Sequence, residues 1–140
     1  MIIVAIDGQG GRLGRELVSS LRRRFPDAVI QAIGTNSVAT ATMLKAGANE
    51  GATGENPVVV ACRHADFIVG PLGIVIADSL MGEVTPGMAM AVCQSAAVRV
   101  LIPMNMCDNL IAGVNAQSGS DLIEDAVEKI AAACGERKQA

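Results

Sequence analysis

Apolar residues along the chain fall into short continuous runs, and between these runs apolar positions recur at helical spacing. Leu13, Leu17 and Leu21 follow one another at i, i+4 and i+8, which places them on one face of a helix. Continuous apolar runs are typical of parallel strands that are buried on both faces of a sheet. The alternation therefore predicts an α/β fold, doubly wound and Rossmann-like, with three layers and a mainly parallel sheet. The predicted strands cover residues 2–6, 28–33, 66–70, 98–102 and 110–114.

Polar residues between these runs mark where helices begin and end. Helix starts are predicted at Asn36 or Ser37, at Asn56 before Pro57, at Thr85 before Pro86, and at Asp121 with Glu124. Gly47 and Gly135 are suited to ending the helices that precede them. Residues 47–56 are expected to form a polar, glycine-rich loop. We expect one domain over residues 1–135, followed by a polar tail at 136–140.

Composition narrows the function classes. In a chain of 140 residues, 51% are hydrophobic and 18% are charged, which favours a compact fold over disorder. The formal net charge of −3 and the near absence of aromatic residues speak against a nucleic-acid partner. Gly70, Pro71, Gly73 and Asp78 interrupt the longest apolar stretch, so no membrane span is expected. The start has no basic signal-like region, and the four cysteines are widely spaced, so we expect a cytoplasmic protein with free thiols and no metal.

A glycine-rich turn connects the first strand to the first helix. A turn of this kind directs backbone N–H groups at a phosphate, so it predicts a nucleotide or another phosphate-bearing ligand. The spacing is G-x-x-G-x-x-G, with Gly8, Gly11 and Gly14, whereas the dinucleotide pattern G-x-G-x-x-G would place its third glycine at Leu13. The alternative is a tight strand–helix turn without a ligand. The candidate contacts in the turn are Gly8, Gln9, Gly10, Gly11, Arg12, Leu13 and Gly14.

The other predicted contacts come from loops at the carboxyl ends of the strands, where ligands bind in such sheets. The second strand ends in small polar residues rather than in the acidic residue that usually holds a ribose diol. Asp7 places a carboxylate beside the expected phosphate, and its repulsion must be offset by the helix N-terminus, by Arg12 or by a cation. The further candidate contacts are Thr35, Asn36, Ser37, Gly70, Pro71 and Asn105.

Candidate catalytic residues are restricted to three carboxylates, Asp7, Asp78 and Glu83. Two carboxylates near one another are suited to acid–base chemistry. The alternative is that the apolar segment Leu72–Ile76 is buried in a subunit interface while Asp78 caps a turn. Because a single domain of this size usually needs a second domain or a subunit to supply a substrate pocket, we predict a homodimer or a higher homo-oligomer.

The segment Val4–Arg15 resembles the nicotinamide-binding segment of dihydrodipicolinate reductase. The resemblance covers only the first strand and helix, and it implies nucleotide contacts at Gly8, Gly11, Arg12, Leu13 and Gly14. NAD or NADP is therefore the leading cofactor candidate. The chemistry of that enzyme is not implied, because it requires a second domain with a histidine-rich motif and this chain has one histidine.

Over its full length the chain is similar to a small uncharacterised bacterial family, a domain of unknown function. The segments that carry this similarity are residues 6–11, 34–37, 51–56 and 70–79. The similarity implies no activity, substrate or cofactor. Two hypotheses follow: an NAD(P)-type nucleotide-binding protein, which as an enzyme would be an oxidoreductase, or a non-enzymatic oligomeric sensor or interaction protein. The second would bind a small metabolite that bears a phosphate or a carboxylate.

Overall fold

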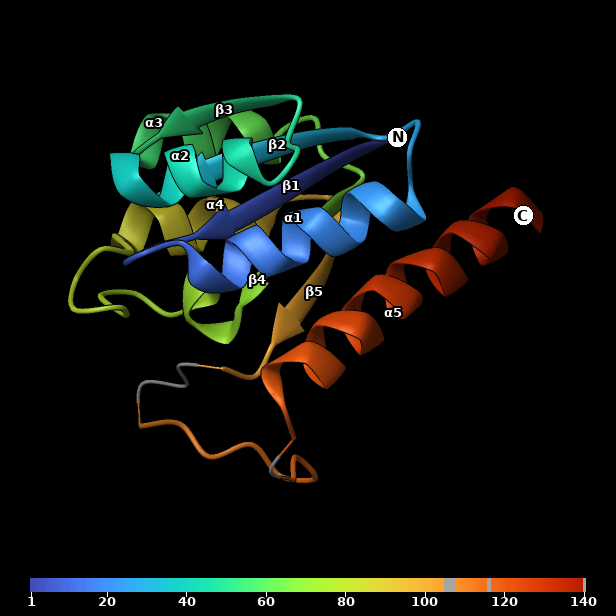
Figure 1. Ribbon diagram of the computed structural model, residues 1–140. Coiled ribbons are helices and arrows are strands. Elements are labelled where there is room, and N and C mark those ends of the chain that lie inside the picture. Colours follow the sequence, from blue (N-terminus) through green and yellow to red (C-terminus); the bar gives the residue numbers. More distant parts are fainter. Residues whose placement is uncertain (105–107, 116, 140) are drawn as a thin grey trace.

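The computed structural model describes residues 1–104, 108–115 and 117–139, with side chains through residue 136. One parallel sheet has the strand order β3-β2-β1-β4-β5, which confirms the predicted doubly wound α/β fold (Figure 1). The order reverses between β1 and β4, so the ligand crevice of such a fold is expected at their carboxyl ends. The strands are β1 (Ile2–Asp7), β2 (Val29–Gly34), β3 (Glu50–Thr53), β4 (Phe67–Pro71) and β5 (Val98–Ile102).

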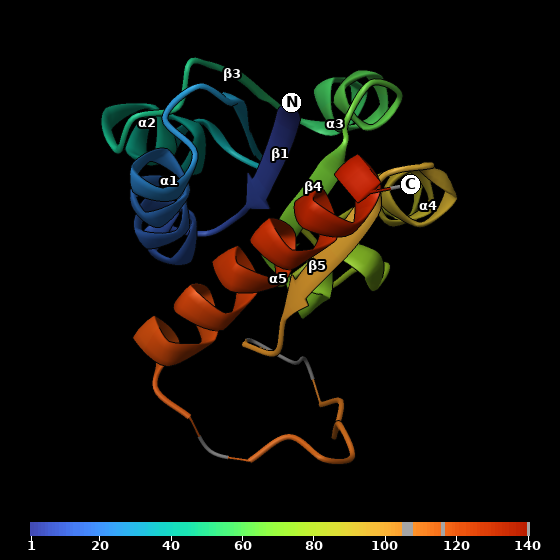
Figure 2. The ribbon, with the colours of Figure 1, turned by 90° about the vertical axis from the view of Figure 1, so that its right-hand side faces the viewer.

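Helices cover both faces of the sheet and complete the three layers (Figures 1 and 2). One face packs against α1 (Arg12–Arg24), α2 (Ser37–Lys45) and α5 (Gly119–Gln139). The other packs against α3 (Glu55–Cys62), the short 3-10 helix η1 (Leu72–Val75) and α4 (Pro86–Gln94). None of the described helices is long and apolar enough to cross a lipid bilayer.

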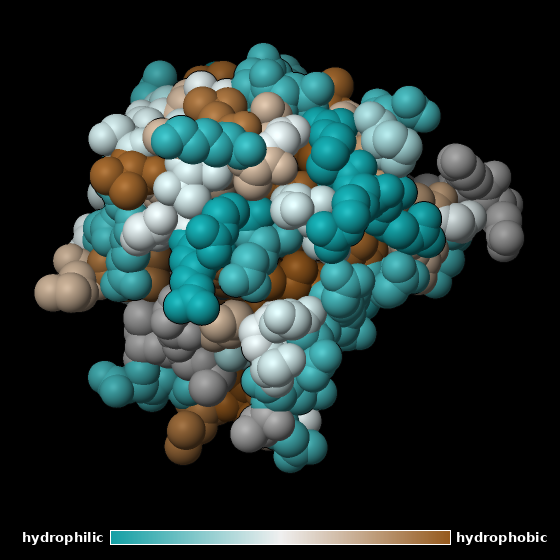
Figure 3. All heavy atoms as spheres, viewed as in Figure 1, coloured by the Kyte–Doolittle hydropathy of each residue, from teal (hydrophilic) through white to brown (hydrophobic). Residues whose placement is uncertain are grey.

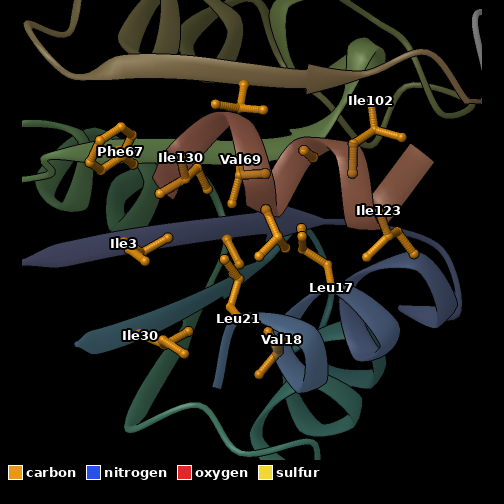
Figure 4. Packing of buried hydrophobic residues seen from close by; sticks show 14 of the residues in the cluster. Ile3, Leu17, Val18, Leu21, Ile30, Phe67, Val69, Ile102, Ile123 and Ile130 are labelled. Carbon is orange, nitrogen blue, oxygen red and sulfur yellow. The ribbon is translucent and has the colours of Figure 1, made fainter. Parts of the chain in front are cut away.

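The first hydrophobic core lies between the sheet and the pair α1 and α5. Leu17 and Leu21 of α1 are fully buried, as their i, i+4 spacing predicts. Ile123 and Ile130 of α5 pack on the same face of the sheet (Figure 4). Burying one such side chain contributes about 1.5–3 kcal/mol, so this core fixes the relative positions of the two helices.

Strand β3 replaces the loop expected over residues 47–56, and that prediction was wrong. Glu50–Thr53 pair in parallel with β2 in the register Gln31↔Glu50, and they form the sheet edge. A polar edge strand is held by its backbone hydrogen bonds, so its composition gives little signal. Helix α3 begins at Glu55 after Gly54, two residues earlier than the predicted start at Pro57 after Asn56, and residues 58–60 are helical as expected.

The strand predicted over residues 110–114 does not form. Residues 108–115 form turns, with Asp108 and Gly113 at φ values of 63° and 82°, and Leu110 is 96% exposed. Helix α5 begins at Gly119 rather than at Asp121 and continues to Gln139 rather than ending at Gly135. Residues 136–139, expected as a polar tail, therefore belong to this helix.

Candidate functional site between two helix ends

The glycine turn, residues 8–14, is organised around the carboxylate of Asp7. This side chain is 5% exposed; its Oδ1 accepts from the Gly8 amide at 2.8 Å and its Oδ2 from the Gly14 amide at 2.7 Å. Burial raises the pKa of Asp7, the two amide hydrogen bonds lower it, and the nearby charge of Glu83 raises it. The net pKa lies above the ordinary value of 3.8, so this carboxylate is a structural acceptor at a cost in desolvation.

Two glycines of the turn are required by packing alone. Gly11 has a φ of 72°, and a Cβ there would lie 2.7 Å from the Cα of Ala39 in α2. A Cβ on Gly14 would lie 2.9 Å from the Cβ of Asp7. Gly10 differs, because it is exposed and a Cβ there would meet nothing within 4 Å. The tight-turn interpretation therefore accounts for Gly11 and Gly14 without any ligand.

Glu83 accepts hydrogen bonds from the polar residues at the end of β2 that the sequence predicted to bind a ligand. It lies in the 76–85 segment, which connects η1 to α4. Its Oε1 accepts from the Gln9 amide at 3.0 Å, from Thr35 Oγ1 at 2.8 Å and from Asn36 Nδ2 at 2.6 Å. Its Oε2 accepts from the Gln9 amide at 3.2 Å. A carboxylate is therefore present beside the carboxyl end of β2, although β2 itself contributes none.

The hydrogen bonds to Glu83 also set its protonation state. Desolvation raises the pKa of Glu83, but the donors from Asn36, Gln9 and Thr35 outweigh that effect and hold it below its ordinary value of 4.5. Glu83 is therefore ionised at neutral pH. A phosphate placed directly over Gly8 and Gln9 would meet this charge, so an anion has a more favourable approach to α1 at the start of the helix.

A cleft of about 510 Å³ lies at that start and joins it to the start of α5. Arg12 and Leu13 are the first two residues of α1, and Gly119 and Ser120 are the first two of α5. Amides at these positions have no acceptor within their own helix. We call this the helix-end cleft; its lining is Gln9, Arg12, Leu13, Glu16, Met104, Gly119, Ser120 and Ile123.

The electrostatics of the helix-end cleft favour an anion. Each helix N-terminus carries about half a positive charge, and two of them meet here. The Arg12 side chain is 87% exposed and is only loosely paired with Glu16, at 3.9 Å. Ser118 precedes α5, and its Oγ accepts from the Asp121 amide at 3.2 Å. This cap therefore does not engage the amides of Gly119 and Ser120, which stand at the helix end. Glu16 is the one carboxylate among the described lining residues.

The predicted site residues are divided among several places. Gln9, Arg12 and Leu13 line the helix-end cleft, whereas Thr35 and Asn36 bind Glu83. Asn36 Oδ1 also accepts from the Ala39 amide, which confirms its predicted cap of α2. Asp7 and Glu83 lie close enough to interact, while Asp78 is exposed in the 76–85 segment at a φ of 63°. Asn105 lies outside the described residues.

The remaining predicted residues have structural surroundings. Ser37 is the exposed first residue of α2. Gly70 and Pro71 are buried at the end of β4, where a Cβ on Gly70 would lie 2.3 Å from the carbonyl oxygen of Ile6. In the segment 72–76, Ile74 is buried in the core of its own chain rather than left free for a partner. The sequence reasoning missed Gly119 and Ser120, although the order Ser118-Gly119-Ser120-Asp121 was a usable signal for a helix start.

Comparisons with known proteins place the chain in a family. No curated protein matches it. Among solved structures, a dodecameric FMN-dependent UbiX-like decarboxylase from Escherichia coli O157:H7 matches with a TM-score of 0.45 and 15% identity, over 96% of this chain and 93% of that chain. A family model described as "Domain of unknown function (DUF3842)" matches residues 2–135, and the chain belongs to that family.

Proposed function

We propose that this domain binds a nucleotide whose phosphate lies in the helix-end cleft. The observation that carries the proposal is that the first two residues of α1, Arg12 and Leu13, and the first two of α5, Gly119 and Ser120, line one cleft. A single helix N-terminus already favours an anion, and phosphates bind there through backbone N–H groups. The Ser120 hydroxyl and the Arg12 guanidinium add donors suited to phosphate oxygens.

An NAD-type dinucleotide is the first candidate within this class. Gln9 lines the helix-end cleft, and its backbone amide donates to Glu83. The Glu83 carboxylate therefore lies next to the cleft. Within the described parts of the chain, Glu83 Oε2 accepts from the Gln9 amide alone, so this oxygen has further capacity to accept from a ribose diol. A 2′-phosphate would instead be repelled by the ionised carboxylate. We therefore propose a preference for NAD over NADP.

The geometry supports binding more than catalysis. Asp7 is committed to the Gly8 and Gly14 amides, and Glu83 is held by Gln9, Thr35 and Asn36. The carboxylate that lines the helix-end cleft, Glu16, is paired with Arg12. We therefore propose no catalytic residue. A sensor that binds a phosphate-bearing metabolite in the same cleft is the second candidate, and it would show phosphate binding without a preference for the nicotinamide dinucleotide.

A thermal-shift screen tests this function. The ligands are inorganic phosphate, AMP, ADP, NAD, NADP and FMN, each with the wild-type protein and with Glu83→Gln. A ligand at 100 times its Kd stabilises the folded protein by about 2.7 kcal/mol, which gives a readily measured shift. The proposal expects a shift with NAD that exceeds the shift with NADP, and a smaller difference between the two in Glu83→Gln. Absence of a shift with every phosphate-bearing ligand would contradict it.

A further inference from the structure

We propose that the ligand site continues from the helix-end cleft into the groove between α1 and α5, where Arg15 binds a second anionic group. The inference rests on the proposed function and narrows its ligand to a molecule with two anionic groups. The groove has a volume of about 430 Å³. Glu16, Ser120 and Ile123 line both the groove and the helix-end cleft, so the two spaces adjoin.

The carboxylates of the groove already have basic or hydroxyl partners. Glu124 Oε1 accepts from the Ser20 hydroxyl at 3.0 Å and lies 3.7 Å from the Arg23 guanidinium. Glu16 is paired with Arg12 at 3.9 Å. Arg15 is exposed, and it has neither an ion pair nor a side-chain hydrogen bond within the described parts of the chain. Its guanidinium is therefore the cation in this groove that is available to a ligand.

The spacing along α1 fits one ligand that bridges the cleft and the groove. Arg15 lies three residues after Arg12, so the two Cα atoms are about 4.5 Å apart along the helix axis and both side chains project from neighbouring positions. The groove is lined by residues 15–23 of α1 and 120–124 of α5, and these two helices lie side by side on one face of the sheet (Figure 1). Figure 3 shows this face, with hydrophilic residues gathered over α1 and the adjoining part of α5.

The ligand class follows from this layout. The first phosphate takes the amides at the two helix ends, and a second phosphate or carboxylate takes the Arg15 guanidinium, with hydroxyls of Ser19 and Ser120 beside it. The second group then lies along the helices rather than across the strand ends, where Glu83 repels anions. A nucleoside bisphosphate has this arrangement of charges, and a nucleoside monophosphate lacks the second one.

The test compares AMP with adenosine 3′,5′-bisphosphate by isothermal titration calorimetry. Three proteins are used: the wild type, Arg15→Gln and Arg63→Gln. Arg63 is an exposed arginine at the end of α3, on the opposite face of the sheet, and its replacement removes the same charge. We expect the wild type to bind the bisphosphate about 5- to 10-fold more tightly than AMP, as a charge-assisted pair at an exposed site would give.

The variants separate the possible outcomes. Arg15→Gln should abolish the preference for the bisphosphate and leave the Kd of AMP within about twofold, while Arg63→Gln should change neither Kd. The inference is overturned if the wild type shows no preference, or if the preference survives in Arg15→Gln. If AMP binds and only the Arg15 effect is missing, the proposed function stands alone. If no phosphate-bearing ligand binds the wild type, both proposals fail.

Discussion

Glu83 accepts a hydrogen bond from the backbone amide of Gln9 at 3.0 Å, across a separation of 74 residues. The contact attaches the 76–85 segment to the glycine turn, and the donors from Thr35 and Asn36 attach it to the end of β2. One carboxylate therefore connects three loops at the carboxyl edge of the sheet.

Removing this carboxylate should destabilise the protein in a pH-dependent way. Glu83→Gln loses charge-assisted hydrogen bonds, and we expect a loss of about 1–2 kcal/mol at neutral pH. Because the pKa of Glu83 is lowered in the folded state, its stabilisation is present above 4.5 and is lost as the pH falls below that value. Denaturant unfolding of both proteins across this range measures the difference. A difference that stays constant as the pH falls below 4.5 would contradict the assigned role.

Asp7 should contribute to the same acid range with the opposite sign. Its pKa is raised in the folded state, so the folded protein binds more protons than the unfolded chain just above 3.8, and stability falls as the pH rises through this window. The free energy of unfolding of Glu83→Gln, measured against pH, should show this slope, because the opposing contribution of Glu83 is removed. A profile of that variant that rises with pH over the same window would argue against the raised pKa.

Neighbouring glycines in the turn should respond differently to alanine. Gly11→Ala meets the backbone of Ala39 and requires a left-handed residue, so we expect a loss of about 2–4 kcal/mol. Gly10→Ala meets open space and should change the free energy of unfolding by less than about 0.5 kcal/mol. Urea unfolding of both variants measures this pair. Equal effects at the two positions would show that the packing of α2 against Gly11 is not the constraint.

The 76–85 segment carries backbone strain that glycine should relieve. Asp78, Leu80 and Met81 all have positive φ, and Met81 is 97% exposed, so its side chain makes little contribution to packing. We expect Met81→Gly to stabilise the protein by about 0.5–1 kcal/mol, because glycine adopts this conformation without steric cost. Met81→Ala is the matched control and should give no such gain. If both variants behave alike in thermal unfolding, the strain is absent.

One backbone donor of the helix-end cleft can be removed without disturbing the helix. Gly119 is the first residue of α5, where proline is favoured, and a Cβ there meets only the end of Met104 at 3.4 Å. We expect Gly119→Pro to raise the Kd of a phosphate-bearing ligand about 10-fold, since it removes one N–H donor to a charged group. Gly119→Ala keeps that donor and should bind like the wild type. Matched affinities of the two variants would exclude the Gly119 amide as a contact.

The sequence predicted what depends on local pattern. The apolar runs identify β1, β2, β4 and β5, and the leucine spacing identifies the buried face of α1. Strand β3 was missed because a polar edge strand is specified by its partner β2 rather than by its own residues. The stretch 110–114 was misread because four apolar residues and a glycine carry no information on whether a sheet edge is there to receive them.

Only the part of the candidate site that belongs to a local sequence motif could be predicted. Gln9, Arg12 and Leu13 belong to a local motif, and they line the helix-end cleft. Gly119 and Ser120 join them only because α5 packs beside α1, and Glu83 reaches Gln9 only through the 76–85 segment. Tertiary packing brings these residues together, and the spacing of residues in the sequence does not predict these contacts.

A two-dimensional ¹⁵N–¹H NMR titration with NAD tests the central claim most directly. The account predicts that the amides of Arg12, Leu13, Gly119 and Ser120 shift together and saturate at one Kd, while amides of α3 and α4 remain in place. Shifts confined to other parts of the chain, or no shift at the start of α5, would contradict a phosphate site between the two helix ends.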